Sequence, residues 1–232
     1  MIEIMTLVKY QDLYDRMIES AVKTAVTPIR YSWAKDTGLP NLAATYNRLG
    51  EKSEADILVF CHDDIEFIED GWDARLIEAL CDYDVAGVCG TVDYRGGRLF
   101  DAGNDKCIGK LGGIVDGKEA VRSFGKVDGV APAMAVDGCF MAVRVSHFAK
   151  CKFDETFDEL FFYDIDYCLR SKCCVVDILV SHNKPDKYRG IYPSEMKPIG
   201  HYWDRFHQKH ELKPQPPGDQ TIKAFHLKEY VS

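Results

Sequence analysis

The sequence DILVFCHDDIEF occupies residues 56–67 and joins an apolar run to a polar cluster. Residues Ile57–Cys61 are all apolar and do not alternate with polar ones, which is typical of a β-strand buried on both faces. His62, Asp63 and Asp64 follow directly. Ligands of open α/β sheets bind beyond the carboxyl ends of the strands, so these three side chains form a candidate site.

Two interpretations of this polar cluster are open. The acidic residues could simply begin a solvated loop, because residues 65–71 carry many charges and end in a glycine. Alternatively, carboxylate oxygens with a nearby imidazole could hold a hard divalent cation, which suits Mg²⁺ or Mn²⁺ better than a metal that prefers soft ligands. The choice between them depends on the rest of the chain.

The composition indicates a single globular domain with a substantial core. The 232 residues are 46% hydrophobic and include no apolar run of transmembrane length and no visible signal peptide. A formal charge of −8 argues against broad electrostatic binding to nucleic acid or anionic membranes. The nine cysteines have no CxxC spacing, which favours buried thiols over disulfides or a zinc site. We therefore expect a cytoplasmic protein with a small-molecule partner or a neutral acceptor.

The first ninety residues alternate strand and helix patterns. The expected elements are a strand at 1–8, a helix at 11–23, a strand at 28–33, a helix at 42–49 capped by Asn41, the strand at 57–61, a helix over 72–80 and a strand at 84–90. This order predicts a three-layer α/β/α sandwich with a mainly parallel central sheet. Asp36 stands where the second strand would end, as a ligand-binding carboxylate or as a turn residue.

The second half adds further candidate residues. The glycine-rich stretch from Gly90 to Gly129 contains no Walker or Rossmann phosphate loop and is expected to be an acceptor-side loop or hairpin. A strand is expected at 136–143, beginning with Asp137 and Gly138, and another at 175–180. His182 follows that last strand and is a candidate third metal ligand.

Two further aspartates, Asp164 and Asp166, fall in the first turn of an expected helix. The helix dipole keeps a carboxylate there ionised, so Asp164 is a candidate base and Asp166 its partner or substitute. An aspartate at this position is also a routine helix cap. The aromatic residues around both carboxylates favour a functional role, because burying an acid among them costs desolvation energy.

Together these segments resemble the GT-A glycosyltransferases, especially family-2-like members with HxD in place of DxD. The resemblance is carried by Leu42–Asn47, Ile57–Asp64, Val136–Val143, Phe162–Arg170 and Val180–His182. It implies a metal-dependent transferase that moves a sugar from a nucleoside-diphosphate donor, with UDP-sugars favoured, to a glycan or other hydroxyl acceptor. Inversion at the sugar carbon is implied, because a single base would serve an in-line attack.

The resemblance also assigns roles to individual residues. Asp64 and His182 would hold Mn²⁺ or Mg²⁺, and Asp164 would take the proton of the acceptor hydroxyl. The residues implied near the donor are Thr6, Asp36, Asn47, His62 and Asp63, and those beneath the sugar and acceptor are Asp137 and Gly138. The sequence departs from the family pattern at His62, which replaces an aspartate, and at Tyr163, which replaces a glutamate.

The resemblance divides the chain into one catalytic domain and a tail. The domain is expected at 1–212, with a nucleotide-binding half (1–90), an acceptor half (91–182) and a closing loop with a helix (183–212), before a tail at 213–232. Two alternatives stay open: a non-catalytic sugar-nucleotide-binding module of the same fold, and a nucleotidyltransferase. The second is disfavoured because the stretch after the first strand, residues 6–10, lacks glycine.

Overall fold

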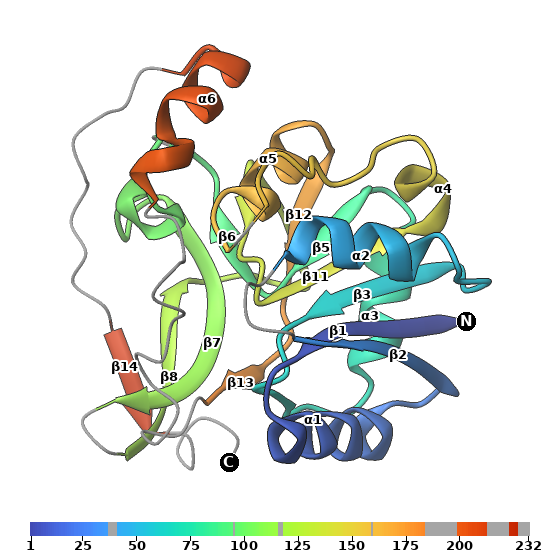
Figure 1. Ribbon diagram of the computed structural model, residues 1–232. Helices are drawn as coiled ribbons and strands as arrows, with labels where there is room; N and C mark the ends of the chain where they lie inside the picture. Colours follow the sequence, from blue (N-terminus) through green and yellow to red (C-terminus); the bar gives the residue numbers. More distant parts are fainter. Residues whose placement is uncertain are drawn as a thin grey trace.

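A mixed seven-stranded sheet forms the centre of the molecule (Figure 1). The computed structural model describes residues 1–36, 41–94, 96–115, 118–158, 160–183, 199–212 and 223–226. The strand order of this sheet is β2-β1-β3-β11-β5-β12-β9. Its strands are β1 (Ile2–Val8), β2 (Ile29–Lys35), β3 (Ile57–Cys61), β5 (Val85–Gly87), β9 (Val130–Ala133), β11 (Phe140–Arg144) and β12 (Cys173–Val176).

The expected mainly parallel sheet is corrected to a mixed one. Strands β1, β2 and β3 are parallel, as are β5 and β12, but β11 lies antiparallel between β3 and β5, and β9 is antiparallel to β12. Strand β11 follows the two-residue strand β10 (Ala135–Val136) through a short turn. No crossover helix precedes β11, and a parallel strand would need a long crossover connection.

Helices cover both faces of this sheet and give the expected three layers. One face packs against α1 (Gln11–Thr24) and α3 (Trp72–Ala79), and the other against α2 (Leu42–Gly50), α4 (Val145–Phe148) and α5 (Tyr163–Leu169). Strand β3 is buried along its whole length and alternates between the two cores: Ile57, Val59 and Cys61 belong to one, Leu58 and Phe60 to the other. This confirms the sequence interpretation of a strand buried on both faces.

A second sheet stands beside the first and contains the glycine-rich region as a hairpin (Figure 1). Its strand order is β10-β6-β7-β13-β4, with β8 paired to β7 and β14 paired to β8. The strands are β4 (Ile65–Phe67), β6 (Cys89–Thr91), β7 (Cys107–Val115), β8 (Lys118–Gly125), β13 (Val180–His182) and β14 (Lys223–His226). A 3₁₀ helix, η1 (Leu99–Ala102), and α6 (Gly200–His210) complete the described elements.

Three strands expected as single pieces are each divided between the two sheets. The expected strand at 84–90 separates into β5 and β6, that at 136–143 into β10 and β11, and that at 175–180 is replaced by the end of β12 and the start of β13. In each case the chain leaves one sheet and enters the other within a few residues, which an apolar run does not reveal.

Two of the expected C-terminal regions are only partly covered by the structure. The expected closing loop lies outside the described residues at 184–198, and so does the expected tail apart from 223–226. Those four residues pair with β8 and so extend the second sheet. None of the helices in the described ranges has the length and apolar character needed to cross a membrane.

Gly109 makes the junction between the sheets sensitive to substitution. Its φ is +92°, and a Cβ placed on it would lie 2.3 Å from the carbonyl oxygen of Val88, between β5 and β6. Gly129 also has a positive φ, +68°, but has nothing within 4 Å of its Cβ position. We expect Gly129→Ala to cost about 1–2 kcal/mol of unfolding free energy from φ alone. Gly109→Ala should cost about 1–3 kcal/mol more, because backbone atoms must move.

Urea unfolding followed by circular dichroism measures both variants against the unsubstituted protein. Equal losses for the two substitutions would contradict the close approach of Gly109 to Val88.

Candidate functional site

His62, Asp64 and His182 converge where the two sheets meet. One ligand atom from each lies within 4.8 Å of the other two, and Nε2 of His182 is 3.0 Å from Oδ1 of Asp64. The pairing of β4 with β13 produces this arrangement, because it places His182 opposite Ile65, the residue after Asp64. The backbone N–H of Asn183 also donates to the carbonyl oxygen of Asp64 at 3.1 Å. Two imidazoles and one carboxylate at this spacing fit a divalent transition-metal cation.

The electrostatics of His182 are set mainly by burial and by Asp64. Burial lowers the pKa of His182, but the hydrogen bond to Asp64 and the negative charge of that carboxylate raise it more, so the net shift is upward. Asp64 is 8% exposed. A cation bound to these side chains would therefore compete with a proton on His182.

Asp63 and Thr6, both expected near the donor, make contacts that hold the framework together. Oδ2 of Asp63 accepts hydrogen bonds from the backbone N–H groups of Lys9 and Tyr10, each at 2.8 Å, at the start of α1. Thr6 is fully buried, and its hydroxyl lies 3.8 Å from the sulfur atoms of both Met17 and Cys61. Neither residue lines the two cavities described next.

A cavity of about 530 Å³ lies next to the histidine–aspartate cluster. His62 belongs to both the cluster and the cavity wall. The other lining residues are Arg98, Asp137, Gly138, Cys139, Leu160, Phe161, Tyr163, Asp164 and Ile199. The structure thus brings the expected base and the two expected sugar-side residues together with His62.

The carboxylate of Asp164 is held in this cavity by backbone donors. Oδ2 accepts from the N–H of Gly138 at 2.9 Å, and Oδ1 accepts from the N–H of Ile165 at 2.8 Å. A Cβ on Gly138 would lie 2.4 Å from the hydroxyl oxygen of Tyr163 and 2.7 Å from Oδ2 of Asp164, so only glycine fits there. That hydroxyl donates to the carbonyl oxygen of Gly138 at 3.1 Å and is 3.4 Å from Nε2 of His62.

The environment of Asp164 gives it the acid–base properties of a general base. Burial and, next, the negative charge of Asp137 raise the pKa of Asp164 to about 7, against the opposing effect of the backbone N–H donors. A base with a pKa near neutrality can accept a proton and release it again under ordinary conditions. Asp137 is itself fixed by accepting from the N–H of Cys139 at 2.8 Å.

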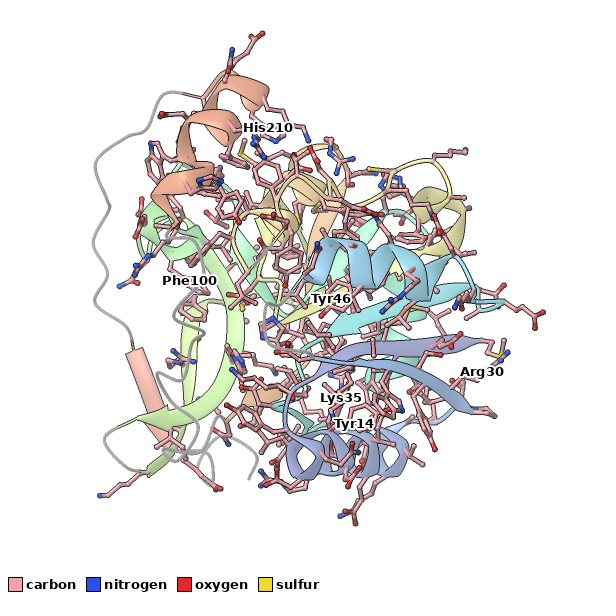
Figure 2. The ribbon with its side chains drawn as sticks, viewed as in Figure 1. Tyr14, Arg30, Lys35, Tyr46, Phe100 and His210 are labelled. Carbon is pink, nitrogen blue, oxygen red and sulfur yellow. The ribbon has the colours of Figure 1, made fainter. Side chains whose placement is uncertain are left out.

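Asp166 lies apart from the cavity and has a different environment from Asp164. It is completely buried. Its carboxylate contacts three basic side chains: Arg170 at 2.7 Å, Lys209 at 2.5 Å and His210 at 2.9 Å. His210, labelled in Figure 2, extends from α6 to meet Asp166 on α5. The contacts of Asp166 therefore join two helices, and the geometry favours Asp164 over Asp166 as a base.

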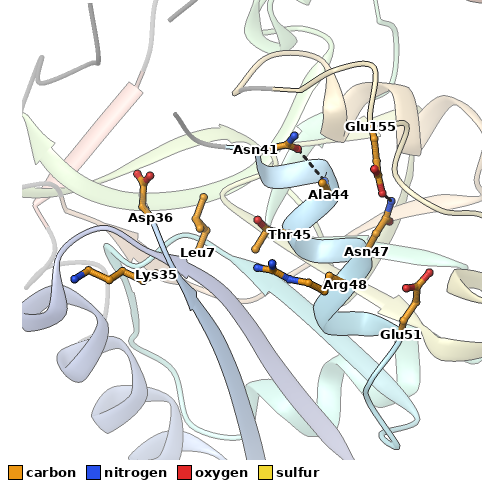
Figure 3. A pocket seen from close by; sticks show the side chains of 10 residues that line it. All are labelled: Leu7, Lys35, Asp36, Asn41, Ala44, Thr45, Asn47, Arg48, Glu51 and Glu155. Atoms are coloured by element: carbon orange, nitrogen blue, oxygen red, sulfur yellow. Dashed lines mark hydrogen bonds between the residues drawn. The ribbon is translucent and has the colours of Figure 1, made fainter. Parts of the chain in front are cut away.

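A second cavity, of about 410 Å³, lies between the ends of β1 and β2 and helix α2 (Figure 3). Its lining includes Asp36 and Asn47, both expected near the donor, together with Leu7, Lys35, Asn41, Ala44, Thr45, Arg48, Glu51 and Glu155. Figure 3 shows Arg48 extending from α2 over the strand ends, and Asp36 at the end of β2.

Asn47 is committed to internal hydrogen bonds. Its Nδ2 donates to the carbonyl oxygen of Phe153 and to Glu155, both at 2.9 Å, and its Oδ1 accepts from the N–H of Phe153 at 3.0 Å. Asn47 thus fixes the 153–155 segment against α2.

Several lining residues were not anticipated from the sequence. Arg98 and Ile199 line the larger cavity, and Arg48 the smaller one. Arg48 lies within the expected helix 42–49, and its distance of three and four residues from Thr45 and Ala44 would have placed it on the cavity face. Arg98 and Ile199 lie in segments without a periodic pattern, which gave no such signal.

The sequence profile of the glycosyltransferase-like family matches residues 11–197. No curated protein matches the sequence significantly. Among solved structures, GalNAc-T7 with UDP, GalNAc and Mn²⁺ superposes with a TM-score of 0.55 at 12% identity, over 92% of this chain and 55% of that one. This similarity concerns the fold, and the expected GT-A fold is confirmed.

Two weaker similarities accompany it. The mannosyltransferase PcManGT from Pyrobaculum calidifontis, in complex with GDP-Man and Mn²⁺, gives a TM-score of 0.49 at 8% identity, over 82% of this chain and 58% of that one. A197 from STIV gives a TM-score of 0.46 at 14% identity, over 76% of this chain and 81% of that one. The chain thus spans little more than half the length of GalNAc-T7 and PcManGT.

The geometry of His62, Asp64 and His182 predicts Mn²⁺ binding. Asp64→Ala and His182→Ala should each weaken it about tenfold or more, because each removes one of three ligands. His201→Ala, which removes an exposed histidine of α6, should leave the affinity unchanged. Electron paramagnetic resonance of free Mn²⁺ measures these affinities. Equal affinities for the Asp64→Ala and unsubstituted proteins would contradict the assignment.

Proposed function

Because the chain belongs to the glycosyltransferase-like family, we propose that it transfers a sugar from a nucleoside-diphosphate donor to an acceptor hydroxyl with the aid of a divalent cation. The observation that carries this proposal is the position of His62, which joins the metal-ligand cluster to the cavity that contains Asp164. A donor diphosphate at the cluster would place its sugar beside that carboxylate.

The cation would be held by His62, Asp64 and His182. When bound, it would supply positive charge to the leaving diphosphate. Two imidazoles in the donor set favour Mn²⁺ over Mg²⁺, because Mg²⁺ prefers oxygen ligands and retains its waters. In the segment 62–64, His62 stands where the first aspartate of a DxD motif would stand, and Asp64 is the second.

The nucleoside of the donor is assigned to the smaller cavity. Asp36 would accept a hydrogen bond from the base or ribose there, and Arg48 and Lys35 would supply positive charge. A UDP-sugar is the first donor to test, because the GalNAc-T7 structure, which has a similar fold, contains UDP. Asn47, Thr6 and Asp63 would support this side of the site indirectly, through the contacts they make with α2, β3 and α1.

The chemistry assigned to the larger cavity is a single displacement. Asp164 accepts the proton of the acceptor hydroxyl while the oxygen of that hydroxyl forms a bond to C1 of the sugar. The bond from C1 to the diphosphate oxygen breaks, and its electron pair leaves with the nucleoside diphosphate. Attack opposite the leaving group inverts the configuration at C1. Asp137 and Gly138 would lie beneath the sugar and acceptor, and Asp166 would keep α5 in place.

The Asp164→Asn variant tests this assignment. Turnover should fall about 10²-fold or more, because a general base contributes that much, while donor affinity stays nearly unchanged. Mass-spectrometric detection of transfer or donor hydrolysis, over a panel of sugar nucleotides with Mn²⁺, measures turnover, and calorimetry measures affinity. If the unsubstituted protein binds a sugar nucleotide but neither hydrolyses nor transfers it with any acceptor, the chain is a binding module and the proposed transferase is wrong.

The pKa of Asp164 also predicts a pH dependence. The base must be ionised, so kcat/KM should rise as the pH increases through about 7 and level off above it. The isosteric Asp137→Asn variant keeps an acceptor for the Cys139 N–H but removes the neighbouring negative charge. In this variant the rise of kcat/KM with pH should therefore occur at lower pH. A kcat/KM profile between pH 5 and 9, about two units on either side of the pKa of Asp164, measures the shift. An unchanged profile would contradict the coupling.

A further inference from the structure

Arg122 of β8 shares a face of the second sheet with the metal-ligand residue His182. In the register of the sheet, Arg122 pairs with Leu111 of β7, and Gly112 of β7 pairs with Ser181 of β13. Side chains alternate along each strand, so Arg122, Gly113 and His182 project from the same face. Gly113 lies on β7, the strand between the other two.

Gly113 leaves room for the guanidinium group to lie over β7. A Cβ placed on Gly113 would be 3.4 Å from Nη2 of Arg122 and 3.6 Å from the carbonyl oxygen of His182. The positive group therefore lies against the strand end that carries His182.

Arg122 also differs from the other partly buried cations in the described ranges. It makes no hydrogen bond or ion pair with any residue there, and its Nε is buried without an acceptor. Lys110, in contrast, contacts Glu69 and Asp177, and Arg170 contacts Asp166. A buried donor without an acceptor carries a desolvation cost that a bound anion would offset.

The position identifies the kind of anion. A guanidinium beside a cation site places two positive groups side by side, and an anion with several oxygens can contact both. The planar fork of arginine matches the oxygens of a phosphate group in bidentate fashion. A diphosphate has enough oxygens to occupy the cation and the fork together.

We propose that Arg122 binds the diphosphate of the donor next to His62, Asp64 and His182, and stabilises the nucleoside diphosphate as it leaves. This inference rests on the proposed function and adds a residue to it. As the bond from C1 to the diphosphate oxygen breaks, its electron pair moves onto that oxygen, and the guanidinium N–H groups donate to the charge that develops on the diphosphate.

Binding measurements test the role of Arg122 without relying on turnover. Calorimetry with inorganic pyrophosphate, UDP and GDP, each with Mn²⁺, should give affinities about 10–100-fold weaker for Arg122→Gln than for the unsubstituted protein. Arg122→Lys should recover part of the loss, since it keeps the charge without the fork. Lys118→Gln, which removes an exposed cation from the same strand, should bind like the unsubstituted protein.

Two controls separate diphosphate binding from general damage. The affinity for Mn²⁺ alone should not fall in Arg122→Gln, and the affinities for uridine and guanosine should not change. Equal binding of the diphosphates by Arg122→Gln and the unsubstituted protein would overturn this inference and leave the proposed function intact. Loss of Mn²⁺ affinity in Arg122→Gln would also overturn it, because Arg122 would then maintain the arrangement of His62, Asp64 and His182 instead of binding the diphosphate. If the unsubstituted protein binds no diphosphate, both proposals fail.

Discussion

The contact between Asp64 and His182 joins the two sheets at the point where the site is built. Asp64 stands in the turn by which the chain leaves β3 of the first sheet for β4 of the second, and His182 ends β13, the partner of β4. The turn containing Asp137 and Gly138 is a second passage, from β10 to β11. His62, Asp64, Asp137 and Gly138 therefore lie in turns that connect the two sheets, and Asp164 on α5 reaches one of these turns through the N–H of Gly138.

Charge is unevenly distributed around these passages. Asp137 and Asp164 lie close enough for one to raise the pKa of the other, and Asp64 raises that of His182. Arg122, on β8 of the second sheet, adds a positive group beside the strand end that carries His182. An acidic protein with a formal charge of −8 would otherwise repel an anionic donor, so a local reversal of sign is needed for such a ligand to approach.

Local features of the fold could be predicted from the sequence, but the relations between distant segments could not. Asn41 caps α2 as expected, with Oδ1 3.0 Å from the N–H of Ala44, because capping involves only neighbouring residues. The apolar run at Ile57–Cys61 showed that the strand is buried on both faces. An apolar run does not reveal, however, whether the strand is parallel or antiparallel to its neighbours. The sequence therefore did not predict that β11 lies antiparallel between β3 and β5.

The candidate site was predictable to a similar extent. The strand-end rule identified His62, Asp64 and His182, because all three follow apolar runs. The separate environments of Asp164 and Asp166 were not visible, since the partners of Asp166, Lys209 and His210, are more than forty positions away and belong to another helix. The burial of Thr6 likewise depends on Met17 and Cys61, which meet only in the folded chain.

The alternation of β3 between two cores has a consequence for how this strand can vary in length. Ile57, Val59 and Cys61 face one helical layer, whereas Leu58 and Phe60 face the other. Inserting or deleting one residue would exchange the layers and turn His62 to the wrong side, whereas a change of two would restore both. The number of residues between the start of β3 and His62 can therefore change only by an even number if both cores are to keep their apolar side chains.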